Sequence, residues 1–297
     1  MRVEAPRLEI MNEVDSKERS EARQIGNKTS GFLVTGIGTI AFALIYQYIY
    51  HLQSLNKSAA ALGMPKMGMQ DMNKYWAFPV LQASGLVGLV AAFISVLLGL
   101  QQSRKAVGWF KLNYRTIDQL HRQIALLTLA LVVVHAVATA FDAMGDSWRT
   151  VLWFNGWANA KTGWPAAVWG YDTGILAFYL ILILGPSFYI RRKIGVSLWK
   201  YAHRFILVFY IGSIWHAMIL GLDIGHYSWI RPTIWILQIP LLWLLAKRFN
   251  GLASKNEGNK GGIKYLTAQA IVLLSYVGMI AALVLVFTGH SDFIANI

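Results

Sequence analysis

Seven long apolar segments constrain the fold of this 297-residue chain more than any other feature of its sequence. They lie at residues 31–52, 77–101, 117–141, 172–190, 202–222, 232–249 and 265–288. Each has about the 20 residues that an α-helix needs to cross the hydrocarbon core of a bilayer. Only 14% of the residues are charged and 56% are hydrophobic, whereas soluble chains carry about 25% charged residues. The sequence therefore predicts an all-α fold, a polytopic membrane helical bundle embedded in lipid.

The segments divide the chain into four parts. We expect a cytoplasmic N-terminal tail at residues 1–30, a six-helix transmembrane core at 31–249, a cytoplasmic loop at 250–264, and a seventh C-terminal transmembrane helix with an outer terminus at 265–297. The tail carries six acidic and six basic side chains without an apolar core, so it does not resemble a signal peptide. The absence of cysteine excludes disulfides, iron–sulfur clusters and covalent haem attachment through C-x-x-C-H.

Basic residues in the loops predict the orientation of the chain. Thirteen follow the second, fourth and sixth segments: Arg104, Lys105, Lys111, Arg115, Arg191, Arg192, Lys193, Lys200, Lys247, Arg248, Lys255, Lys260 and Lys264. Six lie on the opposite side: Lys57, Lys66, Lys74, Arg149, Lys161 and Arg231. Because basic loops stay in the cytoplasm, we expect the N-terminus inside and the C-terminus outside an inner or plasma membrane. Anionic lipid headgroups account for these separate short clusters, so we expect no nucleic acid as a partner.

Four of the seven histidines lie inside predicted membrane segments. His121 and His135 belong to the third segment, and His203 and His216 belong to the fifth. Ionisable residues inside a bilayer are costly, usually face the bundle interior, and are functional by default. A single histidine could equally well donate a hydrogen bond to a carbonyl of a neighbouring helix. Two matched pairs favour a role as ligands.

The spacing of these histidines places them at two levels. His121 and His135 are fourteen residues apart, which is a rise of about 21 Å and a rotation of only about 40°. His203 and His216 are thirteen residues apart, a rise of about 19.5 Å, but their rotation of about 220° points them to different faces. A kink at Gly212–Ser213 could correct this, or Gly212 could only permit close helix packing. Two levels with two imidazoles each predict two stacked haems.

These residues resemble a known family. His121-Arg122 with His135, and Trp199-Lys200-Tyr201-Ala202-His203-Arg204 with His216, resemble the ferric reductase-like transmembrane domain. Its superfamily includes NADPH oxidases, ferric reductases and the haem-binding membrane subunit of the bacterial methionine sulfoxide reductase system. The resemblance covers roughly residues 78–249. It implies a six-helix core that carries electrons through two b-type haems, the inner one held by His121 and His203 and the outer one by His135 and His216.

Two arginines follow the expected inner ligands directly. Arg122 and Arg204 could pair with the haem propionates, since arginine binds carboxylates well. The alternative is that they extend to lipid phosphates at the membrane surface.

The chain departs from the fused members of the family. Those continue into flavin and nicotinamide-nucleotide domains, whereas here residues 250–264 lead to a seventh apolar segment. The G-x-G at Gly36–Gly38 lies inside the first segment, where it is a packing feature rather than a dinucleotide fingerprint. We therefore expect an oxidoreductase component without catalytic residues of its own. Its donor would be a cytoplasmic flavoprotein reductase or membrane quinol, so flavin or quinone would be supplied by a partner, and its acceptor would lie outside.

Other features on the outer side have two interpretations each. Trp148, Trp153, Trp157, Trp164 and Trp169 could form an interfacial aromatic belt, or a lid or docking site over the outer haem. His51, His226 and His290 could gather a metal such as ferric iron or could be solvated loop residues. For the whole chain, the alternatives to electron transfer are a non-catalytic membrane assembly component, whose histidines only form hydrogen bonds, and a haem-free transporter.

Overall fold

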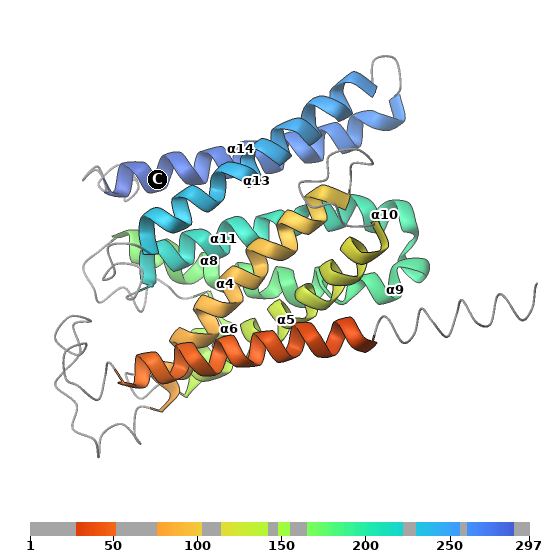
Figure 1. The fold of residues 1–297 in the computed structure, drawn as a ribbon. Coiled ribbons are helices and arrows are strands. Elements are labelled where there is room, and N and C mark those ends of the chain that lie inside the picture. The colour runs from red at the N-terminus through yellow and green to blue at the C-terminus, as the bar shows by residue number, and fades with distance from the viewer. Residues whose placement is uncertain are drawn as a thin grey trace, which may run out of the picture.

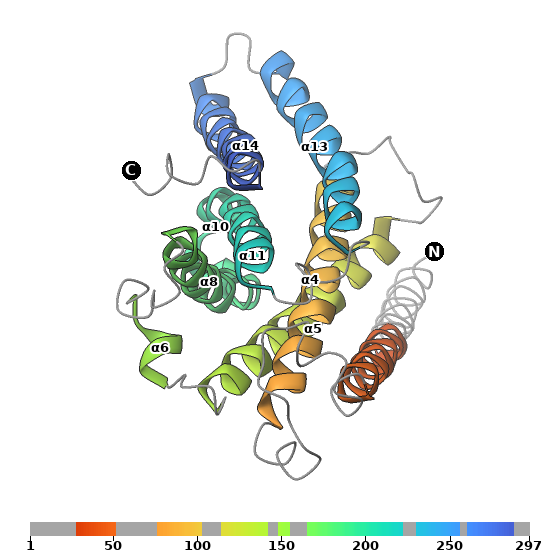
Figure 2. The same cartoon turned by 90° about the vertical axis from the view of Figure 1, so that its left-hand side faces the viewer.

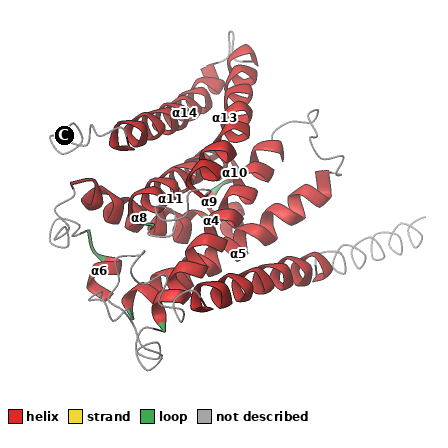
Figure 3. Ribbon diagram, turned by 60° about the vertical axis from the view of Figure 1, so that its left-hand side comes forward, coloured by secondary structure: helices red, strands yellow, loops and turns green. Residues whose placement is uncertain are grey.

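The computed structural model describes residues 28–51, 76–102, 114–141, 148–154, 165–221, 230–255 and 260–287. Within these ranges every regular element is a helix (Figure 3). After a first helix at Lys28–His51, the elements are α4 (Ala77–Gln102), α5 (Tyr114–Ala140), α6 (Trp148–Leu152), α8 (Pro165–Leu184), α9 (Ser187–Ile194), α10 (Val196–Ala202), the 3₁₀ turn η1 (His203–Phe205), α11 (Ile206–Leu220), α13 (Ile230–Lys255) and α14 (Lys260–Phe287). The all-α, polytopic bundle is confirmed.

Five helices in the described part of the chain are long and apolar enough to cross a membrane. They are Lys28–His51, Ala77–Gln102, Tyr114–Ala140, Val196–Leu220 and Tyr265–Leu285. A sixth span results if Gly170–Leu184 and Ser187–Ile194, which meet at a bend of 58°, cross together. The expected segment 232–249 is helical as part of α13, but it is not among these candidates. Polar Gln238 and helix-breaking Pro240 interrupt its apolar sequence.

The helices are arranged around two closely packed antiparallel pairs. The most extensive packing joins α4 to α5 and α8 to α11. Figures 1 and 2 show the first helix lying along α5 on one side, with α13 and α14 on the opposite side of the bundle. A Cβ added to Gly38 of the first helix would overlap the Leu127 side chain of α5. The expected packing role of the Gly36–Gly38 motif is therefore confirmed for Gly38, whereas a Cβ at Gly36 would meet nothing within 4 Å.

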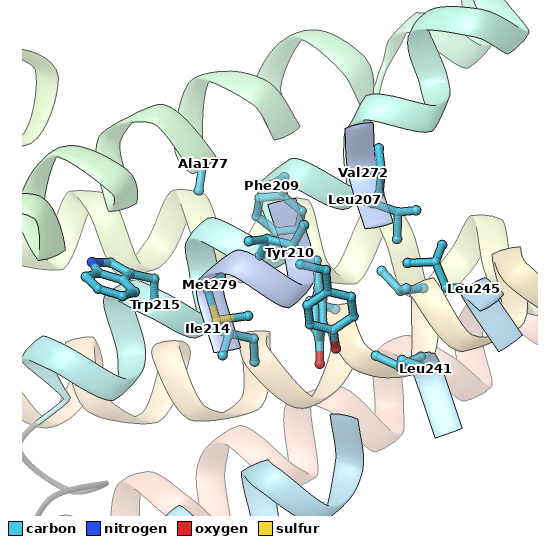
Figure 4. Packing of buried hydrophobic residues seen from close by; sticks show 14 of the residues in the cluster. Ala177, Leu207, Phe209, Tyr210, Ile214, Trp215, Leu241, Leu245, Val272 and Met279 are labelled. Carbon is cyan, nitrogen blue, oxygen red and sulfur yellow. The ribbon is translucent and has the colours of Figure 1, made fainter. Parts of the chain in front are cut away.

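The main core lies where α4, α8, α11, α13 and α14 meet (Figure 4). Its largest fully buried side chains include Tyr210, Leu241 and Leu283. Three polar groups inside it bind one another. The hydroxyls of Tyr210 and Tyr276 both donate to Oε1 of Gln238, and Nε2 of Gln238 donates to the Ile234 carbonyl at 2.7 Å. This network ties α11, α13 and α14 together in a region without bulk water.

The turn before α11 changes the angle between the directions in which His203 and His216 point. Residues 203–205 form a 3₁₀ turn, and α11 then runs unbroken through Gly212. The structure shows no break in α11 at Gly212–Ser213, where the sequence suggested that a kink could lie. A 3₁₀ turn advances about 120° per residue instead of about 100°, so three such residues reduce the offset between His203 and His216 from about 140° to about 80°. Gly212 serves close packing, because a Cβ there would lie 3.2 Å from the Thr173 carbonyl oxygen.

Candidate functional site

The four intramembrane histidines meet in two pairs, each joining α5 to the segment 203–220. The ring centres of His121 and His203 are 6.4 Å apart with their planes at 84°. Those of His135 and His216 are 6.0 Å apart with their planes at 87°. A metal atom held at about 2 Å by the nitrogens of two opposed imidazoles would separate the ring centres by about 6 Å. Both pairs have the separation that a shared metal would require.

Three of the four imidazoles are oriented by a backbone carbonyl of a neighbouring helix. The contacts join Nδ1 of His121 to Ser95 O (2.9 Å), Nδ1 of His135 to Leu81 O (3.0 Å) and Nδ1 of His216 to Gly170 O (3.0 Å). A carbonyl oxygen only accepts hydrogen bonds, so Nδ1 carries the proton in each contact. The other ring nitrogen, Nε2, then keeps its lone pair. This is the tautomer that a metal-binding histidine needs, fixed by an outer hydrogen bond.

A glycine lies four residues beyond each of these carbonyls and against the same imidazole. The glycines are Gly99 beside His121, Gly85 beside His135 and Gly174 beside His216. A Cβ at Gly99 or Gly85 would lie 3.0 or 3.1 Å from the ring, and one at Gly174 would overlap it. We call a carbonyl with the glycine four residues later a carbonyl–glycine motif. It occurs twice on α4 and once on α8, and it lets an imidazole lie directly against a helix backbone.

His203 is held differently. Its Nδ1 is buried and has no hydrogen-bond partner among the described residues. Its ring instead stacks on Trp199, one turn earlier, with ring centres 4.8 Å apart and planes at 22°. Nε1 of Trp199 donates to Oγ of Ser187 at the start of α9 (3.1 Å).

Each pair fits a haem better than a bare metal ion. Among the described residues no group of three or more His, Cys, Asp or Glu could hold a metal ion, and structural zinc sites take four protein ligands. A haem iron receives four nitrogens from its macrocycle and needs only axial ligands from the protein. Paired imidazoles, three of them with a free Nε2, supply that set.

The two arginines beside the His121–His203 pair have protein contacts of their own. Arg122 forms an ion pair with Asp118 (2.8 Å). Arg204 donates from Nη1 to the Lys200 carbonyl (2.8 Å), and its guanidinium lies 4.3 Å from the centre of the Tyr265 ring. Nε of Arg204 is buried without a partner among the described residues. Arg204 therefore keeps an unused donor for an anion, whereas Arg122 is already partly neutralised.

Several residues at this site were missed by the sequence reasoning. Arg248 was counted only as a loop cation, yet its charge acts on both His203 and Arg204. Trp199 belonged to the motif that carried the family resemblance but was given no role, and Ser187 carried no signal of its own. The glycines did carry one, because Gly85 and Gly99 are separated by the same fourteen residues as His135 and His121.

The remaining predicted site residues are only partly within the described ranges. Trp148, the first residue of α6, and Trp153, which follows the helix, are exposed. Trp148 packs edge-on against Phe141 with ring centres 5.7 Å apart. Trp157 and Trp164 lie outside the described residues, and nothing is described of the Trp169 side chain. His51 is exposed at the end of the first helix, and His226 and His290 lie outside the described residues. Their proposed roles stay predictions.

Comparison with known proteins agrees with the family resemblance. Residues 84–214 match the family model described as "Ferric reductase like transmembrane component". The match includes His121, His135 and His203 and ends two residues before His216. No curated protein and no solved structure matches the chain. Residues 84–214, somewhat less than half of the chain, are therefore similar to the ferric reductase-like transmembrane component family.

Proposed function

We propose that this chain carries electrons across the membrane through two b-type haems. His121 and His203 would hold one haem near the cytoplasmic side, and His135 and His216 would hold the other near the outer side. The observation that supports this best is the pairing itself: two pairs of imidazoles, each with about the 6 Å separation of a shared metal. The family implies haem-mediated transmembrane electron transfer in general.

The protein's own groups would bind and orient the two cofactors. When bound, the haem irons would supply the one-electron redox chemistry. The Ser95, Leu81 and Gly170 carbonyls hold their histidines in the ligating tautomer. Arg204, and to a lesser extent Arg122, would bind propionates. The six helices within residues 31–249 would form the haem-binding core, and residues 265–288 would form a seventh span beside it.

The donor and acceptor follow from the expected orientation. With the basic loops in the cytoplasm, electrons would enter at the His121–His203 pair from a flavoprotein reductase or from membrane quinol. They would leave at the His135–His216 pair to an acceptor outside. The chain would act as a ferric reductase-like membrane cytochrome or as the membrane subunit of a reductase.

Two other functions remain as alternatives. The three imidazole–carbonyl hydrogen bonds would also hold helices together without any haem, which favours a non-catalytic assembly component. The 58° break between α8 and α9 favours a haem-free transporter, because broken helices are common in transporters.

Haem content separates these functions. A pyridine haemochrome assay on the purified protein should give two haem b per chain. His121→Ala and His203→Ala should remove one haem, and His135→Ala and His216→Ala should remove the other. One haem in the wild-type chain would contradict the dihaem claim, and none would favour the alternatives.

A further inference from the structure

His203 is the one intramembrane histidine without a carbonyl–glycine motif; the other three each have one. Gly170 and Gly174 of α8 form the carbonyl–glycine motif for His216. His203 lies thirteen residues before His216, and the antiparallel register of α8 against α11 would bring it opposite Ile183 and position 187. The helix bends by 58° at that point, between Leu184 and Ser187. Among the described residues no carbonyl contacts Nδ1 of His203, so the fourth motif is not formed.

By the same register, a fourth carbonyl–glycine motif would have its glycine at position 187. That position is Ser187, which has another role. It accepts a hydrogen bond from the Trp199 indole at 3.1 Å, and the indole stacks on the His203 ring. The hydroxyl of Ser187 also donates to the Leu184 carbonyl (2.6 Å), which fixes its position at the bend. A chain of contacts from the bend to the imidazole thus replaces the direct carbonyl contact.

We propose that Trp199, anchored by Ser187, is the positioning residue for His203, and that the haem at the His121–His203 pair has the higher reduction potential of the two. This inference rests on the proposed function. An Nδ1–H donated to a carbonyl makes an imidazole more basic, and a more basic ligand favours the ferric state. Both imidazoles of the His135–His216 pair have such a bond, whereas within the described part of the chain His203 has none.

The charges near His203 also raise the reduction potential of a haem at this pair. The positive charges of Arg204 and Arg248 both act on the His203 ring. Both arginines are partly buried, and a partly buried positive charge stabilises a nearby added electron more strongly than a fully solvated one, because the local dielectric constant is lower than that of water. The missing hydrogen bond and the two cations therefore both favour the ferrous state at this pair.

The order of potentials is tested by redox titration of the full-length protein in detergent. The wild type should titrate in two steps. His216→Ala, which keeps the His121–His203 pair, should retain the higher step, and His203→Ala should retain the lower one. Equal potentials, or the reverse order, would overturn the inference while leaving the dihaem function intact. A wild type without two haems would overturn both.

The role of Trp199 is tested by three variants and one control. Trp199→Leu removes the stacked ring, whereas Trp199→Phe and Ser187→Ala remove only the indole–hydroxyl bond. The g values of a low-spin ferric haem depend on the angle between its two imidazole planes, so electron paramagnetic resonance should show a shift at the His121–His203 site alone. We expect the largest shift and at least a twofold loss of that haem in Trp199→Leu, and smaller effects in the other two.

The double variant Trp199→Phe/Ser187→Ala should resemble either single variant, because both remove the same bond. Trp243→Leu on α13, which removes an indole that contacts Lys247, should leave both signals unchanged. A merely structural role for Trp199 would change both haems together or neither. Either result would overturn its assignment as the positioning residue.

Discussion

Gly174 and His216 are in such close contact that a Cβ added to the glycine would overlap the imidazole ring. The same ring donates from Nδ1 to the Gly170 carbonyl on the same helix. The histidine therefore cannot move away from the glycine without losing its orienting hydrogen bond. A single methyl group added at position 174 should thus displace the imidazole ring of His216, the proposed ligand.

Gly174→Ala should empty the proposed outer haem site and leave the inner one occupied. The added methyl group must displace the ring or separate α8 from α11, and overpacking of this kind costs about 1–3 kcal/mol. The measurement is haem content per chain together with the number of redox steps. Gly278→Ala on α14 is the matched control, because a Cβ there meets nothing within 4 Å. Retention of both haems in Gly174→Ala would contradict the assignment of His216.

Gln238→Leu should destabilise the protein without changing the haem spectra. The substitution leaves the buried hydroxyls of Tyr210 and Tyr276 without their shared acceptor, and each unsatisfied buried group costs about 1–3 kcal/mol. Thermal unfolding in detergent should show a lower midpoint. Tyr276→Phe removes one donor and leaves the acceptor bound by Tyr210, so its effect should be smaller. A shifted haem spectrum at normal stability would mean that the network serves the cofactors.

The direction of electron flow can be measured in sealed vesicles of known orientation. The positive-inside distribution predicts that electrons enter on the cytoplasmic face and leave on the outer face. An impermeant acceptor should therefore be reduced only when the outer face is accessible to it. Reduction confined to the cytoplasmic face would show that the expected topology or direction is wrong.

A docked flavoprotein donor predicts a dependence on salt. Arg192 and Lys193 are exposed in the last turn of α9, where they would attract an acidic partner. Reduction of the inner haem by such a donor should slow as ionic strength rises, because exposed charges are screened within about 8 Å at physiological salt. Replacing both residues by glutamine should slow it too, and Arg149→Gln, exposed at α6, should not. Salt-independent reduction that disappears when quinone is extracted would favour quinol instead.

The sequence was sufficient to predict most of the spans and both histidine pairs. Apolar length alone identifies a helix such as Tyr114–Ala140, and a fourteen-residue spacing keeps His121 and His135 on one face of it. The span within α13 was harder to predict from apolar length. Gln238 lies inside this helix and binds two tyrosines from other helices. A polar residue satisfied by tertiary partners lowers the hydropathy of a segment without excluding it from a bundle.

What the sequence could not provide is the register between helices. The contact of Ser95 with His121 depends on how α4 lies against α5, and no local pattern specifies that alignment. The 3₁₀ turn at His203–Phe205 has the same origin. It reduces the angular offset between His203 and His216, whereas the sequence suggested a kink at Gly212 for that role.

Both carbonyl–glycine motifs that face α5 belong to one helix, α4, and this has a consequence for electron exchange. Leu81 and Ser95 are separated by the same fourteen residues as the histidines they orient, so the rigid rise of one helix fixes the two sites about 21 Å apart along its axis. A thicker or thinner bilayer changes the tilt of such a helix rather than its length. If the two sites hold haems as proposed, the distance between them would depend little on lipid composition. One inserted residue in α4 would instead turn one contact away by about 100°.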